Sequence, residues 1–164
     1  MLHYVYNQHE DVARFVAQLI PDVRELGFGR CKAIGVVDAS GRAIAGVVYH
    51  NWQPRFGVIE MSAAATTPRW LTRETLQRIY DYPFEQLQVQ MVMKLVSRDD
   101  ERLLDQLARG GYVFYRFPRA FGRDRDGVIC ELTSEAWAEC KFNSKRKPEP
   151  GMAEFNAWLN EEAA

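Results

Sequence analysis

The chain has 164 residues, of which 47% are apolar and 26% are charged, a composition that fits one ordinary globular domain. Lysine and arginine total 21 against 22 aspartate and glutamate, so the net charge of −1 argues against a protein that binds nucleic acid or a membrane mainly through bulk charge. No apolar run approaches the roughly 20 residues that span a bilayer, and the first residues lack the basic and apolar blocks of a signal peptide. We therefore expect no membrane partner and no secretion.

The three cysteines, Cys31, Cys130 and Cys140, are odd in number, far apart and without a C-x-x-C pair. This pattern predicts neither a disulfide framework nor a zinc site. Reduced thiols are typical of the cytoplasm, so we expect a cytoplasmic protein without a bound metal.

The first half of the chain predicts one helix and three strands. Between Glu10 and Ile20, apolar residues recur at spacings of three and four, which indicates an amphipathic helix. The segments 31–37 and 44–52 are apolar and β-branched, and the turn between them favours an antiparallel hairpin. After a second break, residues 58–65 predict a third strand beside these two.

The second half alternates helices with strands. Thr67 and Pro68 have the residue types that cap and begin a helix, and the helical period continues to about Pro83. A second helix, over 99–109, begins with acidic residues and stops at two glycines. Strands are predicted at 88–96, 112–117 and 128–132. The order predicts a mixed α/β fold.

The end of the chain changes in composition. Residues 141–147 hold four positive charges, and residues 149–164 hold four negative ones. Prolines at 148 and 150 mark a linker, after which Phe155, Trp158 and Leu159 form an apolar stripe at helical spacing. We therefore expect a helical extension over 134–164 that contains a basic linker at 141–150. The apolar stripe after the linker is expected to dock on the body of the domain or on a second copy in a homodimer.

The order of elements and the segment from Val96 to Tyr112 resemble the GNAT N-acetyltransferase superfamily. The segment is similar to the family block N-x-x-A-x-x-x-Y-x-x-x-G-F, with Asp100 in place of Asn and Tyr112 in place of Phe. The resemblance covers residues 1–133. It implies an α/β fold with a central mixed, mostly antiparallel twisted sheet of six to seven strands flanked by helices. It also implies acetyl-CoA as co-substrate, bound by the fourth strand and the helix that follows, with Asp100 at the cofactor site.

The pyrophosphate motif of the family, R-x-x-G-x-G/A, is degenerate here. If Arg69 takes the position of the motif's arginine, then Thr72 and Glu74 occupy its glycine positions. Side chains at those positions crowd the phosphates, and a carboxylate repels them, because the family binds them with backbone N–H groups. We expect Arg69 and Arg73, together with Thr72, to supply the phosphate contacts instead.

A second departure concerns the departing thiolate, which the family often protonates with a tyrosine. Leu107 stands at that position and has no proton to donate. A CoA thiol resembles a free thiol, whose pKa is about 8.5, so its thiolate leaves without an acid or takes a proton from water.

Acetyl transfer to an amine needs a proton acceptor and a wall for the pantetheine arm. Glu60, in the apolar segment 58–61, is the expected acceptor, and the alternative is that it faces solvent or pairs with an arginine. Met61, Ser62, Ala63 and Ala64 are the expected wall, because small side chains let a ligand approach the backbone. These residues equally fit a tightly packed strand end.

His50 and Trp52 occupy alternating positions of a strand and are expected to share one face. If that face lines the acceptor cleft, His50 serves as a base, and Trp52 with Tyr49 contacts the substrate. A half-buried structural histidine gives the same pattern.

These observations predict an acyl-CoA-dependent N-acyltransferase that moves an acetyl group to a primary amine of a small molecule or peptide by direct attack in a ternary complex. One alternative is a catalytically inactive module that keeps the fold for binding or regulation. Another is a nucleic-acid-modifying or nucleic-acid-binding protein that uses the aromatic and arginine-rich run between Tyr115 and Arg125 together with the basic residues 141–147. A hairpin with alternating core and solvent residues also explains that run.

Overall fold

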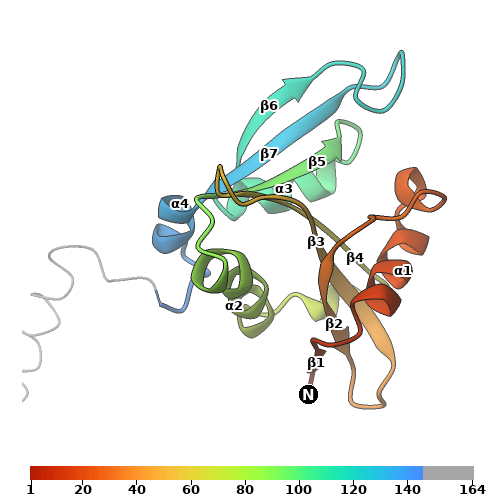
Figure 1. The fold of residues 1–164 in the computed structure, drawn as a ribbon, viewed down its shortest axis with the longest axis vertical. Helices are drawn as coiled ribbons and strands as arrows, with labels where there is room; N and C mark the ends of the chain where they lie inside the picture. The colour runs from red at the N-terminus through yellow and green to blue at the C-terminus, as the bar shows by residue number, and fades with distance from the viewer. Residues whose placement is uncertain (146–164) are drawn as a thin grey trace, which may run out of the picture.

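The computed structural model describes residues 1–145 and contains one seven-stranded sheet (Figure 1). The strand order is β1-β2-β3-β4-β5-β7-β6, and every pair of neighbours is antiparallel except β4 and β5. The strands are β1 (His3–Val5), β2 (Lys32–Val37), β3 (Ala43–Gln53), β4 (Val58–Ala65), β5 (Met91–Ser97), β6 (Val113–Phe117) and β7 (Gly127–Thr133). The predicted mixed, mostly antiparallel sheet is confirmed.

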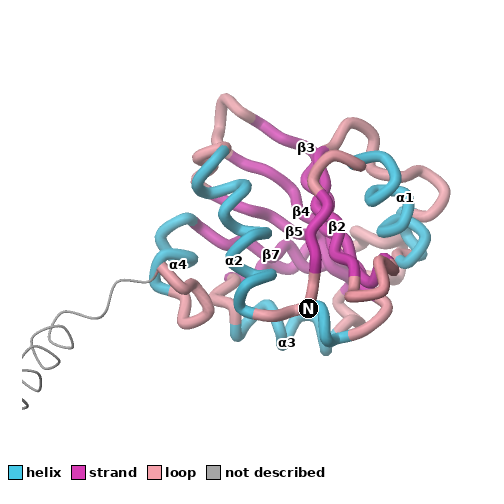
Figure 2. The backbone as a smooth tube through the Cα atoms, turned by 90° about the horizontal axis from the view of Figure 1, so that it is seen from below, coloured by secondary structure: helices cyan, strands magenta, loops and turns pink. Residues whose placement is uncertain are grey.

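Helices cover both faces of the sheet (Figure 2). They are α1 (His9–Leu19), α2 (Arg73–Asp81), α3 (Glu101–Arg109) and α4 (Ser134–Glu139). The first helix packs Val16 against Ala33 and Val48 on one face. The other three pack against the opposite face, where the larger apolar core lies. Among the described residues, none of the helices is long and apolar enough to cross a membrane.

The sheet opens between β4 and β5. These strands are paired only from Val58 opposite Met91 to Glu60 opposite Met93. Beyond that point β4 stays paired with β3, while β5 stays paired with β7. The two halves of the sheet therefore diverge, and the side chains and backbone of the residues after Glu60 and Met93 face an opening.

The predicted start of the second helix was wrong. Thr67 caps only a short turn, Pro68–Trp70, by accepting a hydrogen bond from the backbone N–H of Arg69. The helix α2 begins at Arg73, because the Thr72 backbone is extended and its hydroxyl accepts the N–H of Thr75. Two threonines with the chemistry of an N-cap lie five positions apart, and the second one caps the α-helix.

The expected helical extension after residue 133 begins with a short helix. The helix α4 follows β7 directly, and its Trp137 is buried 4.5 Å from the ring of Tyr80. The apolar stripe at 155–159 and residues 146–150 of the basic linker lie outside the described residues, so the docking of the tail and the division at residue 133 stay predictions.

Candidate active site at the opening of the sheet

A cavity of about 810 Å³ occupies the opening between β4 and β5. Its walls come from the end of β4, from β5, and from the helices α2 and α3. Four of the predicted cofactor residues on these elements line it: Met61, Ala63, Ala64 and Arg73. The small side chains of β4 leave this space beside the backbone, as their expected role as a ligand wall requires.

The arginines at this cavity differ from those that the resemblance implies. Arg73 lines it, and so do Arg102 and Arg109 on α3, whereas Arg69 and Thr72 do not. Sequence reasoning overlooked the two arginines of α3, although their spacing of seven residues places them on one face of a helix. The site therefore has three guanidinium groups suited to phosphate oxygens.

Neither side chain at the glycine positions of the motif obstructs the cavity. The Thr72 hydroxyl is engaged with Thr75 as the cap of α2. The Glu74 carboxylate turns along the outside of α2, where it accepts a hydrogen bond from Arg78 at 2.9 Å. Glu74 therefore does not line the cavity, and the guanidinium of Arg78 offsets its negative charge.

Asp100 also lines the cavity, but it has a structural task there. Its carboxylate accepts the backbone N–H of Leu103 at 3.1 Å and thereby caps α3. Contact between Asp100 and a cofactor stays a prediction.

On the opposite face of the same opening, three polar side chains form a cluster. Register pairs His50 with Glu60 and Val48 with Ser62, which turns all three polar residues to the side of α1. His50 Nε2 lies 3.0 Å from Ser62 Oγ, and His50 Nδ1 lies 3.8 Å from Glu60 Oε2. Asn51 donates to the same Glu60 oxygen at 2.7 Å. We call His50, Glu60 and Ser62 the base cluster.

The base cluster is partly shielded from solvent. The exposed fraction of the side chain is 9% for His50 and 16% for Glu60, and the ring of Phe28 lies 5.0 Å from the imidazole. Burial lowers the pKa of His50, the Lys94 ammonium lowers it further, and Glu60 opposes both effects. His50 is therefore neutral at pH 7 and able to accept a proton.

The alternation expected from His50 to Trp52 breaks in the structure. The pairing of β3 with β4 shifts between His50 and Gln53, and Asn51 has a left-handed backbone with φ of 48°. Asn51 thus reaches Glu60, and the side chain of Trp52 is 48% exposed. A one-residue irregularity of this kind leaves no mark in the hydrophobic pattern.

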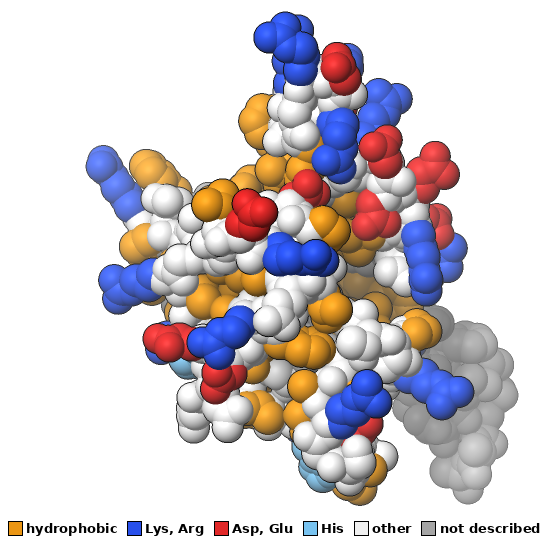
Figure 3. All heavy atoms as spheres, turned by 90° about the vertical axis from the view of Figure 1, so that its right-hand side faces the viewer, with side chains coloured by type: hydrophobic (Ala, Val, Ile, Leu, Met, Phe, Trp, Pro, Cys, Tyr) orange, Lys and Arg blue, Asp and Glu red, His pale blue; other side chains and the backbone are white. Residues whose placement is uncertain are grey.

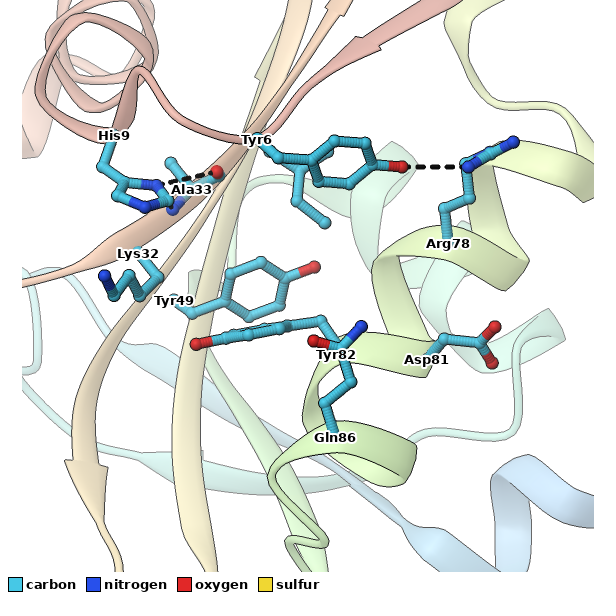
Figure 4. A pocket seen from close by; sticks show the side chains of 10 residues that line it. Tyr6, His9, Lys32, Ala33, Tyr49, Arg78, Asp81, Tyr82 and Gln86 are labelled. Atoms are coloured by element: carbon cyan, nitrogen blue, oxygen red, sulfur yellow. Dashed lines mark hydrogen bonds between the residues drawn. The ribbon is translucent and has the colours of Figure 1, made fainter.

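Tyr49 is not part of the base cluster. It is buried on the face toward α2, where its hydroxyl donates to the carbonyl of Ile79 at 2.6 Å. Figure 4 shows it in a separate hollow of about 380 Å³, beside Tyr82 and near the hydrogen bond from Arg78 to Tyr6. The structure does not bring Tyr49 to the face where Glu60 lies.

Aspartates neutralise much of the arginine-rich run. Asp126 accepts hydrogen bonds from the guanidinium of Arg116 and from the backbone N–H of Arg119, and Arg125 pairs with Asp22 at 3.4 Å. On the side shown in Figure 3, basic and acidic side chains are interspersed. The run does lie in the β6–β7 hairpin, but all five residues of β6 are exposed, so the expected alternation of core and solvent residues is wrong for this strand. Within residues 1–145, no group of three His, Cys, Asp or Glu side chains is arranged to hold a metal ion.

Comparison with solved structures identifies the fold. Mutant forms of the spermidine/spermine N-acetyltransferase SpeG from Vibrio cholerae match with a TM-score of 0.68 over 86% of this chain and 99% of that one, at 15% identity. A dodecameric spermidine N-acetyltransferase from the same organism matches with a TM-score of 0.65 over 83% of this chain and 95% of that one, at 16% identity. The chain has the GNAT fold. No family model and no curated protein matches the sequence.

Proposed function

We propose that the chain is an acyl-CoA-dependent N-acyltransferase that moves an acetyl group from acetyl-CoA to a primary amine. The observation that carries this proposal is the meeting of two features at one opening. The cavity lies on the face of the sheet covered by α2 and α3, and the base cluster lies on the other face. A thioester held between the strands exposes its carbonyl carbon to an amine beside Glu60, so donor and acceptor meet in one ternary complex.

The cavity accommodates the parts of CoA in order. Arg73 and Arg102, near the beginnings of α2 and α3, line the cavity and suit the phosphates, because guanidinium groups bind phosphate oxygens with paired hydrogen bonds. Arg109 also lines it, at the other end of α3, where it pairs with Asp105. The pantetheine arm then runs along the small residues 63–65 toward Met61. This path places the thioester at the inner end, next to the base cluster.

The base cluster supplies the proton acceptor. An amine reaches the protein mostly as an ammonium ion and has to lose a proton before its nitrogen attacks. Neutral His50 accepts that proton, and Glu60 stabilises the resulting imidazolium at Nδ1. Asn51 holds the Glu60 carboxylate in this position.

The acceptor face favours a cationic substrate. Register aligns Glu60, Met93 and Glu131 across β4, β5 and β7, so the two carboxylates lie on the same face. Tyr115 donates to Glu131 at 3.1 Å and holds it there. Two carboxylates suit an amine with a second positive charge, as in the spermidine and spermine named for the structural neighbours. A homodimer and a cytoplasmic location stay part of the proposal.

The proposal is tested with purified protein, acetyl-CoA and a panel of di- and polyamines, with CoA release as the readout. Glu60→Gln keeps the shape of the side chain but removes its charge, and we expect release to fall about 100-fold. Acetyl-CoA affinity is expected to stay unchanged. Glu74→Gln makes the same chemical change on the outside of α2 and is expected to behave as wild type.

Two results would contradict the proposal. If calorimetry shows that the wild type does not bind acetyl-CoA, the cavity is not a cofactor site. If it binds acetyl-CoA but releases no CoA with any amine, the chain is a binding module with this fold.

A further inference from the structure

Lys94 occupies the point where β4 and β5 separate. It directly follows Met93, the last residue of β5 that is paired with β4. Only 8% of its surface is exposed, and its Nζ donates across the opening to the carbonyl oxygen of Met61 at 3.3 Å. Both residues line the cavity, so the ammonium lies at its inner end.

The charge of Lys94 is poorly compensated. Among the described residues its Nζ makes one hydrogen bond, to Met61, and it forms no ion pair. An ammonium group has three donors, and a buried one without a carboxylate partner is costly. A methionine or leucine would fill the same place without that cost. The position is therefore suited to a bound group that carries negative charge.

We infer that the Lys94 ammonium binds the sulfur of CoA and donates its proton to the departing thiolate. The inference rests on the proposed function. Met61 and Lys94 line the same cavity as the arginines and residues 63–65, and they lie where β4 and β5 separate. A pantetheine arm that follows β4 toward this point brings the sulfur to Lys94. Leu107 lines the same cavity without a proton to give, so Lys94 supplies the acid that this position lacks.

The nitrogen lone pair of the neutral amine forms a bond to the carbonyl carbon, and the carbon–sulfur bond then breaks with its electron pair on sulfur. The thiolate takes a proton from the Lys94 ammonium and becomes the CoA thiol. The proton lost by the new amide nitrogen passes to the base cluster and then to solvent, and Lys94 regains a proton from solvent.

The acidity of Lys94 suits this role. Burial lowers its pKa to about 8, while Cys130 and Glu60 act in the opposite direction. A thiol has a pKa of about 8.5, so the proton transfer is nearly balanced in free energy. Burial keeps the Cys130 thiol protonated. The titratable and charged groups around Lys94 are Glu60, His50 and Cys130, and around the cavity Arg73, Tyr80, Asp100, Arg102, Arg109 and Tyr112.

A purely structural role for Lys94 is the competing explanation, in which it only satisfies the carbonyl of Met61. Two variants separate the roles. Lys94→Gln keeps a hydrogen-bond donor but has no charge, and Lys94→Met has neither. Lys145→Met is the matched control, because Lys145 lies on the surface, where it pairs with Asp81.

The deciding experiment measures the pKa of the thiol of bound CoA from the ultraviolet absorbance of the thiolate, so it needs no turnover. In the wild type we expect this pKa to lie at least about one unit below the free value of about 8.5. Both Lys94 variants are expected to lose that shift and about 100-fold in kcat. Lys145→Met is expected to keep both.

The result that would overturn the inference is a bound thiol with the same pKa in the wild type and in Lys94→Met. Full activity in Lys94→Gln would also overturn it, since that outcome indicates a structural role. Failure of the wild type to bind CoA would remove the proposed function and this inference together. Binding with the expected thiol shift but without acyl transfer would remove the proposed function and the proton donation, and would leave only the binding of the sulfur by Lys94.

Discussion

His50 has surroundings that keep a base neutral while holding it in place. Phe28 covers the ring, Ser62 contacts one nitrogen and Glu60 faces the other. Burial of the imidazole disfavours its charged form more strongly than Glu60 favours it. Each partner thus contributes to a different requirement: orientation from Ser62, charge stabilisation from Glu60, and a low pKa from burial.

This environment leads to a prediction about pH. Because the pKa of His50 lies below its ordinary value of 6.5, the neutral base persists to lower pH than a free imidazole would. With both substrates saturating, kcat is expected to fall on the acid side with a midpoint below 6.5. His50→Gln should lower kcat by about 100-fold or more and remove this acid limb. An acid limb that is unchanged in His50→Gln would assign the proton transfer to another group.

At the scale of elements, alternate side chains of β4 lie on opposite faces of the sheet, so the strand contributes to both the cavity and the base cluster. Met61 and Ala63 line the cavity, while Glu60 and Ser62 belong to the base cluster on the other face. In the proposed function, this strand contacts the acyl donor on one face and carries the proton acceptors on the other.

The opposite layer depends on glycine. A Cβ at Gly46 of β3 would lie 2.6 Å from Val16 Cγ2 and 2.8 Å from Val12 Cγ1, so α1 sits directly on the strand backbone. Gly46→Ala is expected to lower the free energy of unfolding by about 2 kcal/mol, because the helix has to shift. Chemical denaturation measures this change.

The same clash provides a control for Gly46→Ala. Val16→Ala removes one obstructing methyl group, so the double variant is expected to lose less stability than the sum of the two single variants. Strictly additive losses would show that α1 does not pack on β3 as closely as the structure has it.

At the scale of the molecule, the two halves of the sheet share only three paired positions between β4 and β5. A ligand in the opening contacts β4 and α2 from one half and β5 and α3 from the other. If the cavity binds CoA as proposed, we expect the ligand to join the two halves of the sheet where paired strands do not.

Acetyl-CoA at 100 times its dissociation constant is expected to raise the free energy of unfolding by about 2.7 kcal/mol, which a thermal scan detects as a shift of roughly 5–10 °C. Arg102→Gln should weaken affinity roughly tenfold, because it removes a charged contact at the cavity. Arg69→Gln should leave affinity unchanged. A larger loss in Arg69→Gln than in Arg102→Gln would contradict the placement of the phosphates.

Much of the fold follows from local patterns. The period of three and four predicted α1, and the two glycines after Arg109 predicted the end of α3. The chain order of elements predicted a mixed α/β fold, and the family resemblance implied its mostly antiparallel sheet. The start of α2 was mistaken because Thr67 and Thr72 both have the chemistry of a cap, and only packing selects between them.

By itself, the sequence determined the net charge of −1, the mixed α/β fold, and the residues of β4 as a candidate site. Only the tertiary structure decided which arginines reach the cavity and that Lys94 bridges to Met61. The physical reason is range. Helix period and strand alternation arise between residues a few positions apart, whereas these contacts join strands and helices up to 33 positions apart in the chain.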